Sequence, residues 1–111
     1  MAELNLDPQF KSILDEIVRR IVEVAHPDRV ILFGSAVRGA MGPDSDFDIL
    51  VVKSGPIHRR HTAQKIHGAM FGVGAPVDII VVTPEDVEES MKGVGSIIPV
   101  AVSEGVQLYA A

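Results

Sequence analysis

The sequence predicts an α/β (α+β) fold, in which a mixed β-sheet of about four strands is flanked by helices. Two kinds of segment indicate this. The runs 47–52 and 77–82 are short and rich in β-branched residues, which is typical of buried strands. In 8–25, by contrast, apolar residues recur at the spacing of one helix face. Strands interleaved with helices in one short chain favour a single sheet covered by helices.

Capping residues bound the elements of the first half. Asp7 and Pro8 have the character of an N-cap and a first helical turn, and Pro27 cannot continue a helical hydrogen-bond ladder. We therefore expect a helix over 8–25, a strand over 29–33, a turn over 39–44 and a strand over 47–52.

The second half follows the same alternation. Thr83 and Pro84 form an N-cap and an N1 proline, and the next two residues are acidic, as the first turn of a helix prefers. We expect a helix over 57–71, a strand over 77–82, a helix from 84 to about 91, a short helix over 97–103 and a terminal strand over 106–109.

Size and composition limit the function classes. The chain has 111 residues, which suits one domain over 1–111. A net charge of −5 disfavours a broad nucleic-acid surface. No apolar run approaches the roughly 20 residues of a membrane helix, and the acidic N-terminus does not have the pattern of a secretory signal. The absence of cysteine excludes disulfides, and we expect a cytoplasmic protein.

A Gly-Ser loop follows the expected strand 29–33. Gly34 lacks a Cβ, so backbone N–H groups next to it can approach an anion closely, and a helix after the loop would point its N-terminus at that anion. Ser35 and its neighbouring amides are candidates to bind the phosphates of a nucleoside triphosphate. Arg38 is a candidate to neutralise the leaving group.

Acidic residues lie close to this loop and in the strand 77–82. Asp46 and Asp48 are two positions apart, so an extended chain directs both carboxylates to one face. Asp78 lies in an otherwise apolar strand, where a carboxylate is costly unless it is paired, metal-bound or at an exposed end. We expect Asp78 as the third ligand of one or two Mg²⁺ ions, because oxygen ligands beside substrate phosphates suit this metal.

Other motifs fit poorly. A P-loop needs Lys and Ser or Thr where Ala40 and Met41 stand. A calcium loop starting at Asp44 would need Gly at position 49 and Glu at position 55, which are Ile49 and Gly55. The histidines and basic residues of 57–71 are read as a solvated face, with a role in holding an acceptor or partner left open.

Together, the loop and the carboxylates carry a resemblance. The chain resembles the minimal nucleotidyltransferase family of the polymerase-beta-like nucleotidyltransferase superfamily. The family pattern is Gly-Ser, an Arg-Gly a few residues later and then Ser-Asp-x-Asp, and the chain has a matching residue at each place. These residues are Gly34, Ser35, Arg38, Gly39, Ser45, Asp46 and Asp48.

The resemblance implies a nucleotidyltransferase fold, with metal ligands at Asp46, Asp48 and Asp78 and the triphosphate at Gly34 and Ser35. It also implies ATP or another nucleoside triphosphate as donor. Members often act with a separate helical partner, as in toxin-antitoxin pairs in which a partner tyrosine receives an adenylyl group. A silent nucleotide-binding module that neutralises a partner, and an aminoglycoside-type transferase built as a homo-oligomer, stay open as alternatives.

Overall fold

The computed structural model contains a mixed sheet of four strands. It describes residues 7–37, 46–92 and 97–111. The strand order is β3-β2-β1-β4. β1 (Arg29–Phe33) lies antiparallel to both β2 (Phe47–Val52) and β4 (Val106–Ala110). β3 (Val77–Val82) runs parallel to β2 and forms one edge of the sheet. The mixed sheet expected from the sequence is confirmed.

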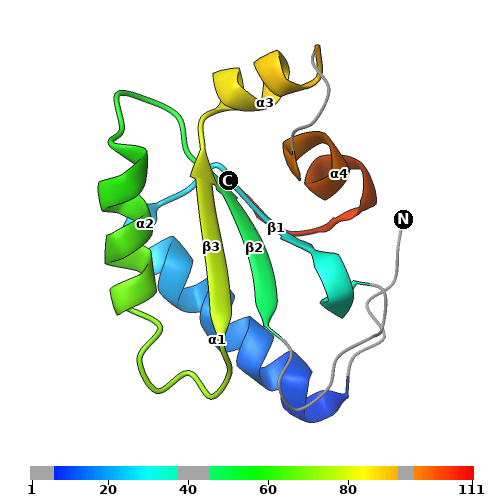
Figure 1. Cartoon of the computed structure of the whole chain (residues 1–111). Helices are drawn as coiled ribbons and strands as arrows, with labels where there is room; N and C mark the ends of the chain where they lie inside the picture. The colour runs from blue at the N-terminus through cyan, green and yellow to red at the C-terminus, as the bar shows by residue number, and fades with distance from the viewer. Residues whose placement is uncertain (1–6, 38–45, 93–96) are drawn as a thin grey trace.

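Helices lie around this sheet. In Figure 1, α1 crosses behind the strands, α2 lies along the β3 side, and α3 and α4 lie at the top and on the β1 side. None of the helices in the part of the chain that the structure describes is long and apolar enough to cross a membrane. The bounds are Pro8–Ala25 for α1, Arg59–Gly68 for α2, Pro84–Ser90 for α3 and Ile97–Glu104 for α4.

Most element bounds agree with the sequence prediction within about one residue, but α2 is shorter than the expected helix over 57–71. It begins at Arg59 because the His58 side chain acts as the N-cap, its Nδ1 accepting from the His61 N–H at 3.2 Å. The chain then leaves the helix after Gly68 and turns at Gly72, whose φ is +75°. A histidine N-cap is not among the usual capping signals, so the sequence did not mark this start.

The sheet is apolar on both faces because alternate strand residues point to opposite sides. One face packs against α1 and α2 through residues such as Leu32, Phe47 and Ile49. The other face packs against α4, where Phe33 and Leu50 of the sheet lie in one buried cluster with Ala101 of the helix. Even-numbered residues of β2 therefore face α4, and odd-numbered residues face α1.

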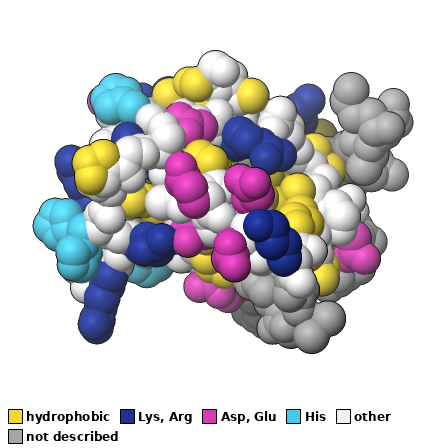
Figure 2. Space-filling view, turned by 90° about the horizontal axis from the view of Figure 1, so that it is seen from above, with side chains coloured by type: hydrophobic (Ala, Val, Ile, Leu, Met, Phe, Trp, Pro, Cys, Tyr) yellow, Lys and Arg dark blue, Asp and Glu magenta, His cyan; other side chains and the backbone are white. Residues whose placement is uncertain are grey.

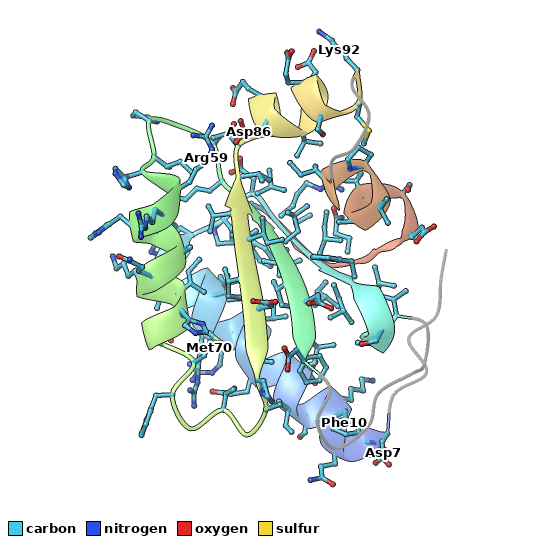
Figure 3. The ribbon with its side chains drawn as sticks, in the orientation of Figure 1. Asp7, Phe10, Arg59, Met70, Asp86 and Lys92 are labelled. Atoms are coloured by element: carbon cyan, nitrogen blue, oxygen red, sulfur yellow. The ribbon has the colours of Figure 1, made fainter. Side chains whose placement is uncertain are left out.

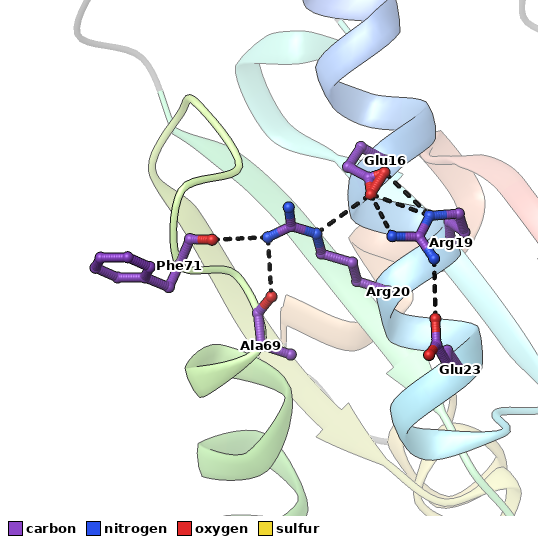
Figure 4. Close-up of polar contacts among 6 residues, drawn as sticks. All are labelled: Glu16, Arg19, Arg20, Glu23, Ala69 and Phe71. Atoms are coloured by element: carbon purple, nitrogen blue, oxygen red, sulfur yellow. Dashed lines mark hydrogen bonds and ion pairs between the residues drawn. The ribbon is translucent and has the colours of Figure 1, made fainter.

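Arg20 ties α1 to the connection between α2 and β3. Its guanidinium donates to the carbonyl oxygens of Ala69, at 3.1 Å, and Phe71, at 2.8 Å (Figure 4). Glu16 lies on the same helix and binds both Arg19 and Arg20, and hydrogen bonding by Arg19 lowers the pKa of Glu16 to about 2. These contacts fix the chain segment that leads into β3.

Candidate functional site

The Gly-Ser loop begins where β1 ends. Gly34 has a φ of +79°, a conformation that a residue with a Cβ rarely adopts. The chain then makes a single 3-10 turn over Gly34–Ala36, closed by the Val37 N–H donating to the Gly34 carbonyl at 3.1 Å. Up to residue 37, the chain after β1 thus forms this short turn, a segment for which the sequence predicted no element of its own.

The Asp48 carboxylate lies directly against Gly34. Phe33 pairs with Asp48 across the antiparallel β1–β2 ladder, which brings the start of the loop next to the second residue of β2. A Cβ on Gly34 would overlap Asp48 Oδ2 and would lie 3.1 Å from Asp48 Cγ. Glycine is therefore required here to make room for a carboxylate as well as for its backbone conformation, a role that the sequence did not indicate.

Asp48 and Asp78 occupy paired positions on neighbouring parallel strands. Side chains at paired positions of a ladder project to the same face, here the face that carries Leu50 and α4. The structure thus brings these two predicted residues together. Asp78 is exposed, so its place near the start of β3 avoids the burial cost that first singled it out.

Asp46 is exposed and directly precedes β2. Phe47, which follows it, is 0 % exposed and packs edge-on against Phe10, with ring centroids 6.3 Å apart. This aromatic anchor fixes the start of the strand on the α1 face.

Within the described ranges, no three His, Asp or Glu residues form a group that could hold a metal ion. The metal role of Asp46, Asp48 and Asp78 as a set therefore stays a prediction.

The remaining loop residues are only partly described. Ser35 is half-buried within the 3-10 turn, at the end of the sheet where Asp48 lies. Arg38 and the expected turn over 39–44 lie outside the described residues. The phosphate-binding role of Gly34, Ser35 and Arg38 stays a prediction.

A hollow of about 470 Å³ lies between α2 and the free edge of β3. Asp78 and Ile79 line it from the strand, and Gln64 and His67 are among the residues that line it from the helix. Its size is in the range of small-molecule sites. Sequence reasoning missed it, because the gap between a helix and a sheet edge depends on packing that no local motif encodes.

An ion pair between α2 and α3 lies away from the three predicted metal ligands. Arg59 of α2 binds Asp86 of α3 with one nitrogen on each carboxylate oxygen, at 2.6 and 2.8 Å. This contact, with help from the Thr83 backbone N–H, lowers the pKa of Asp86 to about 2. Figure 3 shows Arg59 and Asp86 near the end of β3, whereas Asp78 lies near the start of that strand. We therefore assign this ion pair a structural role.

Comparisons with solved structures agree with this fold. A crystal structure of a toxin-antitoxin with AMP-PNP has a TM-score of 0.55 and 21% sequence identity, over 87% of this chain and 73% of that chain. A crystal structure of a mutant of the toxin-antitoxin MntA-HpeT also has a TM-score of 0.55 and 21% identity, over 88% of this chain and 72% of that one. At this identity the likeness shows the fold alone.

A search of curated proteins finds no match. The model of the nucleotidyltransferase domain family, however, matches residues 11–108. Because this match spans most of the chain, the protein belongs to the nucleotidyltransferase domain family.

Proposed function

We propose that this chain, as a single domain over 1–111, transfers a nucleoside monophosphate from a nucleoside triphosphate to a hydroxyl group, with ATP as the donor. The observation that carries the proposal is the pairing of Asp48 with Asp78 on adjacent strands, with Asp48 seated against Gly34. Family membership supports the general reaction. The toxin-antitoxin structure with AMP-PNP supports an adenine nucleotide as the donor.

The chemistry of the three proposed ligands suits Mg²⁺, although these described residues do not form a three-residue metal group in the structure. Asp46, Asp48 and Asp78 offer only carboxylate oxygens, which this ion prefers, and Gly34 makes room for the Asp48 carboxylate. These three residues would hold one or two ions. Bound Mg²⁺ supplies charge that activates the attacking hydroxyl and stabilises the leaving pyrophosphate.

The chain's own residues would position the reactants. The amides at Gly34 and the Ser35 hydroxyl bind the triphosphate, and Arg38 adds positive charge at the leaving group. The acceptor oxygen forms a bond to the α-phosphorus as the bond from that phosphorus to pyrophosphate breaks. The hydroxyl proton passes to a carboxylate oxygen of Asp78.

We propose a helical protein partner as the source of the acceptor, with a tyrosine hydroxyl as the receiving group. The two similar solved structures are toxin-antitoxin structures, which supports a paired system. The hollow of about 470 Å³ between α2 and β3 has Asp78 among its lining residues. Asp78 is exposed, so a residue of a second protein can reach it.

The test is transfer of label from ATP that carries ³²P at the α-phosphate. The chain and Mg²⁺ are incubated with the product of the reading frame adjacent to its gene, and label on that product is measured after gel separation. Asp48→Asn and Asp78→Asn should abolish labelling, whereas Asp15→Asn, an exposed change on α1, should leave it intact. Equal labelling by the Asp48 variant and by wild type would refute the proposed site.

A silent regulatory module is the second candidate. The observation that favours it is that no three acidic or histidine side chains in the described segments form a group that could hold a metal. In that case the double variant Asp46→Asn, Asp48→Asn would still neutralise a toxic partner in cells. A catalytic antitoxin would lose neutralisation with the same change.

A further inference from the structure

A second hollow, of about 280 Å³, lies where α1 ends and α2 begins. His26 contributes to it from the end of α1, Lys53 from the end of β2, and His61, Thr62 and Lys65 from α2. Among the described residues that line it, none carries a carboxylate. It is separate from the hollow beside Asp78, which other residues of α2 line.

The second hollow gathers several basic side chains, although the chain as a whole is acidic. The chain carries 15 Asp and Glu against 10 Lys and Arg, yet two lysines and two imidazoles share this hollow. Figure 2 shows acidic side chains in the middle of the molecule's upper face and histidines toward the α2 side. Like charges held together repel one another, and a bound anion relieves that repulsion.

None of these basic side chains is neutralised by the protein. In residues 7–37, 46–92 and 97–111, the side chains of His26, Lys53, His61 and Lys65 form no ion pair. The two ammonium groups and the two imidazoles therefore remain available to a ligand.

The backbone holds Lys53 in place. Its N–H donates to the Val82 carbonyl at 2.9 Å, and its Nζ donates to the His26 carbonyl at 3.4 Å. That second contact uses one of the three donors of an ammonium group, so two stay free. His26 itself has a φ of +48° as the C-cap of α1, which turns the chain beside the hollow. The donors are thus carried by fixed backbone.

We propose that this hollow binds a small phosphate-bearing anion at a site separate from the proposed catalytic one. Two ammonium groups, two imidazoles and the Thr62 hydroxyl can donate to several oxygens of one tetrahedral anion. The volume is near the lower end of ligand sites, which suits a single phosphate group rather than a whole nucleotide. Lys53 follows Asp48 by five residues, which is about 17 Å along an extended strand.

The test is a titration of the ¹⁵N-labelled full chain with sodium phosphate, followed by two-dimensional NMR. EDTA is present, and sodium chloride at equal ionic strength serves as the reference. We expect saturable shifts of the amides of His26, Lys53 and Thr62. The double variant Lys53→Gln, Lys65→Gln should weaken binding at least about tenfold.

A matched variant, Lys11→Gln with Lys92→Gln, removes the same charge from exposed lysines outside the hollow and should bind phosphate as wild type does. Lys53→Arg with Lys65→Arg keeps the charge and should retain binding if folding is preserved. Shifts that grow linearly without saturation, shifts confined to Gly34 and Ser35, or equal loss in the two Gln variants would overturn the proposal. Because no transfer reaction is measured, the result is independent of the proposed catalytic function.

Discussion

Replacing Gly34 with alanine tests the geometry on which the proposed site depends. The added methyl group would overlap Asp48 Oδ2 and lie 3.1 Å from Cγ and 3.4 Å from Cβ of the same residue. The aspartate side chain must therefore rotate away. Since Asp48 pairs with Asp78, moving the Asp48 carboxylate also changes its position relative to that of Asp78.

Two effects set the expected magnitude. Alanine at a φ of +79° costs about 1–2 kcal/mol in backbone strain, which lowers the melting temperature by about 4–10 °C in a domain of this size. Displacing a catalytic group by about 1 Å can cost about 100-fold in rate. We therefore expect Gly34→Ala to fold with reduced stability and to lose transfer by about that factor.

Gly55→Ala is the matched control. Gly55 has a φ of +97°, in the same left-handed region as Gly34, but a Cβ there would meet no atom within 4 Å. Both variants should lose stability through strain, measured by thermal unfolding, while only Gly34→Ala should lose nucleotide transfer. If both variants retain the same transfer rate at a temperature where both are folded, the contact between Gly34 and Asp48 has no role in the reaction.

Three further predictions concern stability. Thr83→Ala removes the capping box of α3, in which Thr83 Oγ1 accepts from the Asp86 N–H at 3.0 Å. This change should lower the free energy of unfolding, measured by chemical denaturation, by about 1 kcal/mol, whereas Thr83→Ser should keep most of the wild-type stability. The pKa of Asp86 is lowered to about 2, so its stabilisation is present above pH 4 and is lost as the pH falls toward 2. Arg59→Gln should raise that pKa in an NMR titration and flatten this part of the stability curve; an unchanged pKa would contradict the assignment. Gly105→Ala should destabilise by about 1–3 kcal/mol, because a Cβ would lie 2.6 Å from Ile31 Cγ2, and wild-type stability of this variant would show that the turn before β4 can shift.

The elements that could be predicted from sequence are those with strong local signals. The helix over 8–25 has an apolar stripe and a capping Asp7, and its bounds agree with α1. The strand 77–82 is marked by its β-branched run between turn residues. The start of α2 was missed because His58 caps it through a side-chain nitrogen, a contact that depends on how the preceding segment folds.

The sequence predicts those features of the site that follow from the alternation of side-chain directions along a single strand. Phe47 and Asp48 must face opposite sides, which follows from the period of a strand. The approach of Asp48 to Gly34 depends on the antiparallel register with β1, and the hollow beside Asp78 depends on how far α2 lies from the sheet edge. Neither distance is encoded by a residue type or a spacing.

The pairing of Asp48 with Asp78 depends on register more than on the aspartates themselves. A slip of one residue between β2 and β3 would move Asp78 to the face that packs against α1 and α2. Backbone hydrogen bonds at both ends of the two strands oppose such a slip. The Phe47 N–H donates to the Pro76 carbonyl at 3.0 Å, and the Lys53 N–H donates to the Val82 carbonyl at 2.9 Å. Arg20 adds a third constraint on the connection into β3 (Figure 4). The connection between α2 and β3, which carries none of the predicted metal ligands, thus has a direct part in placing one of them.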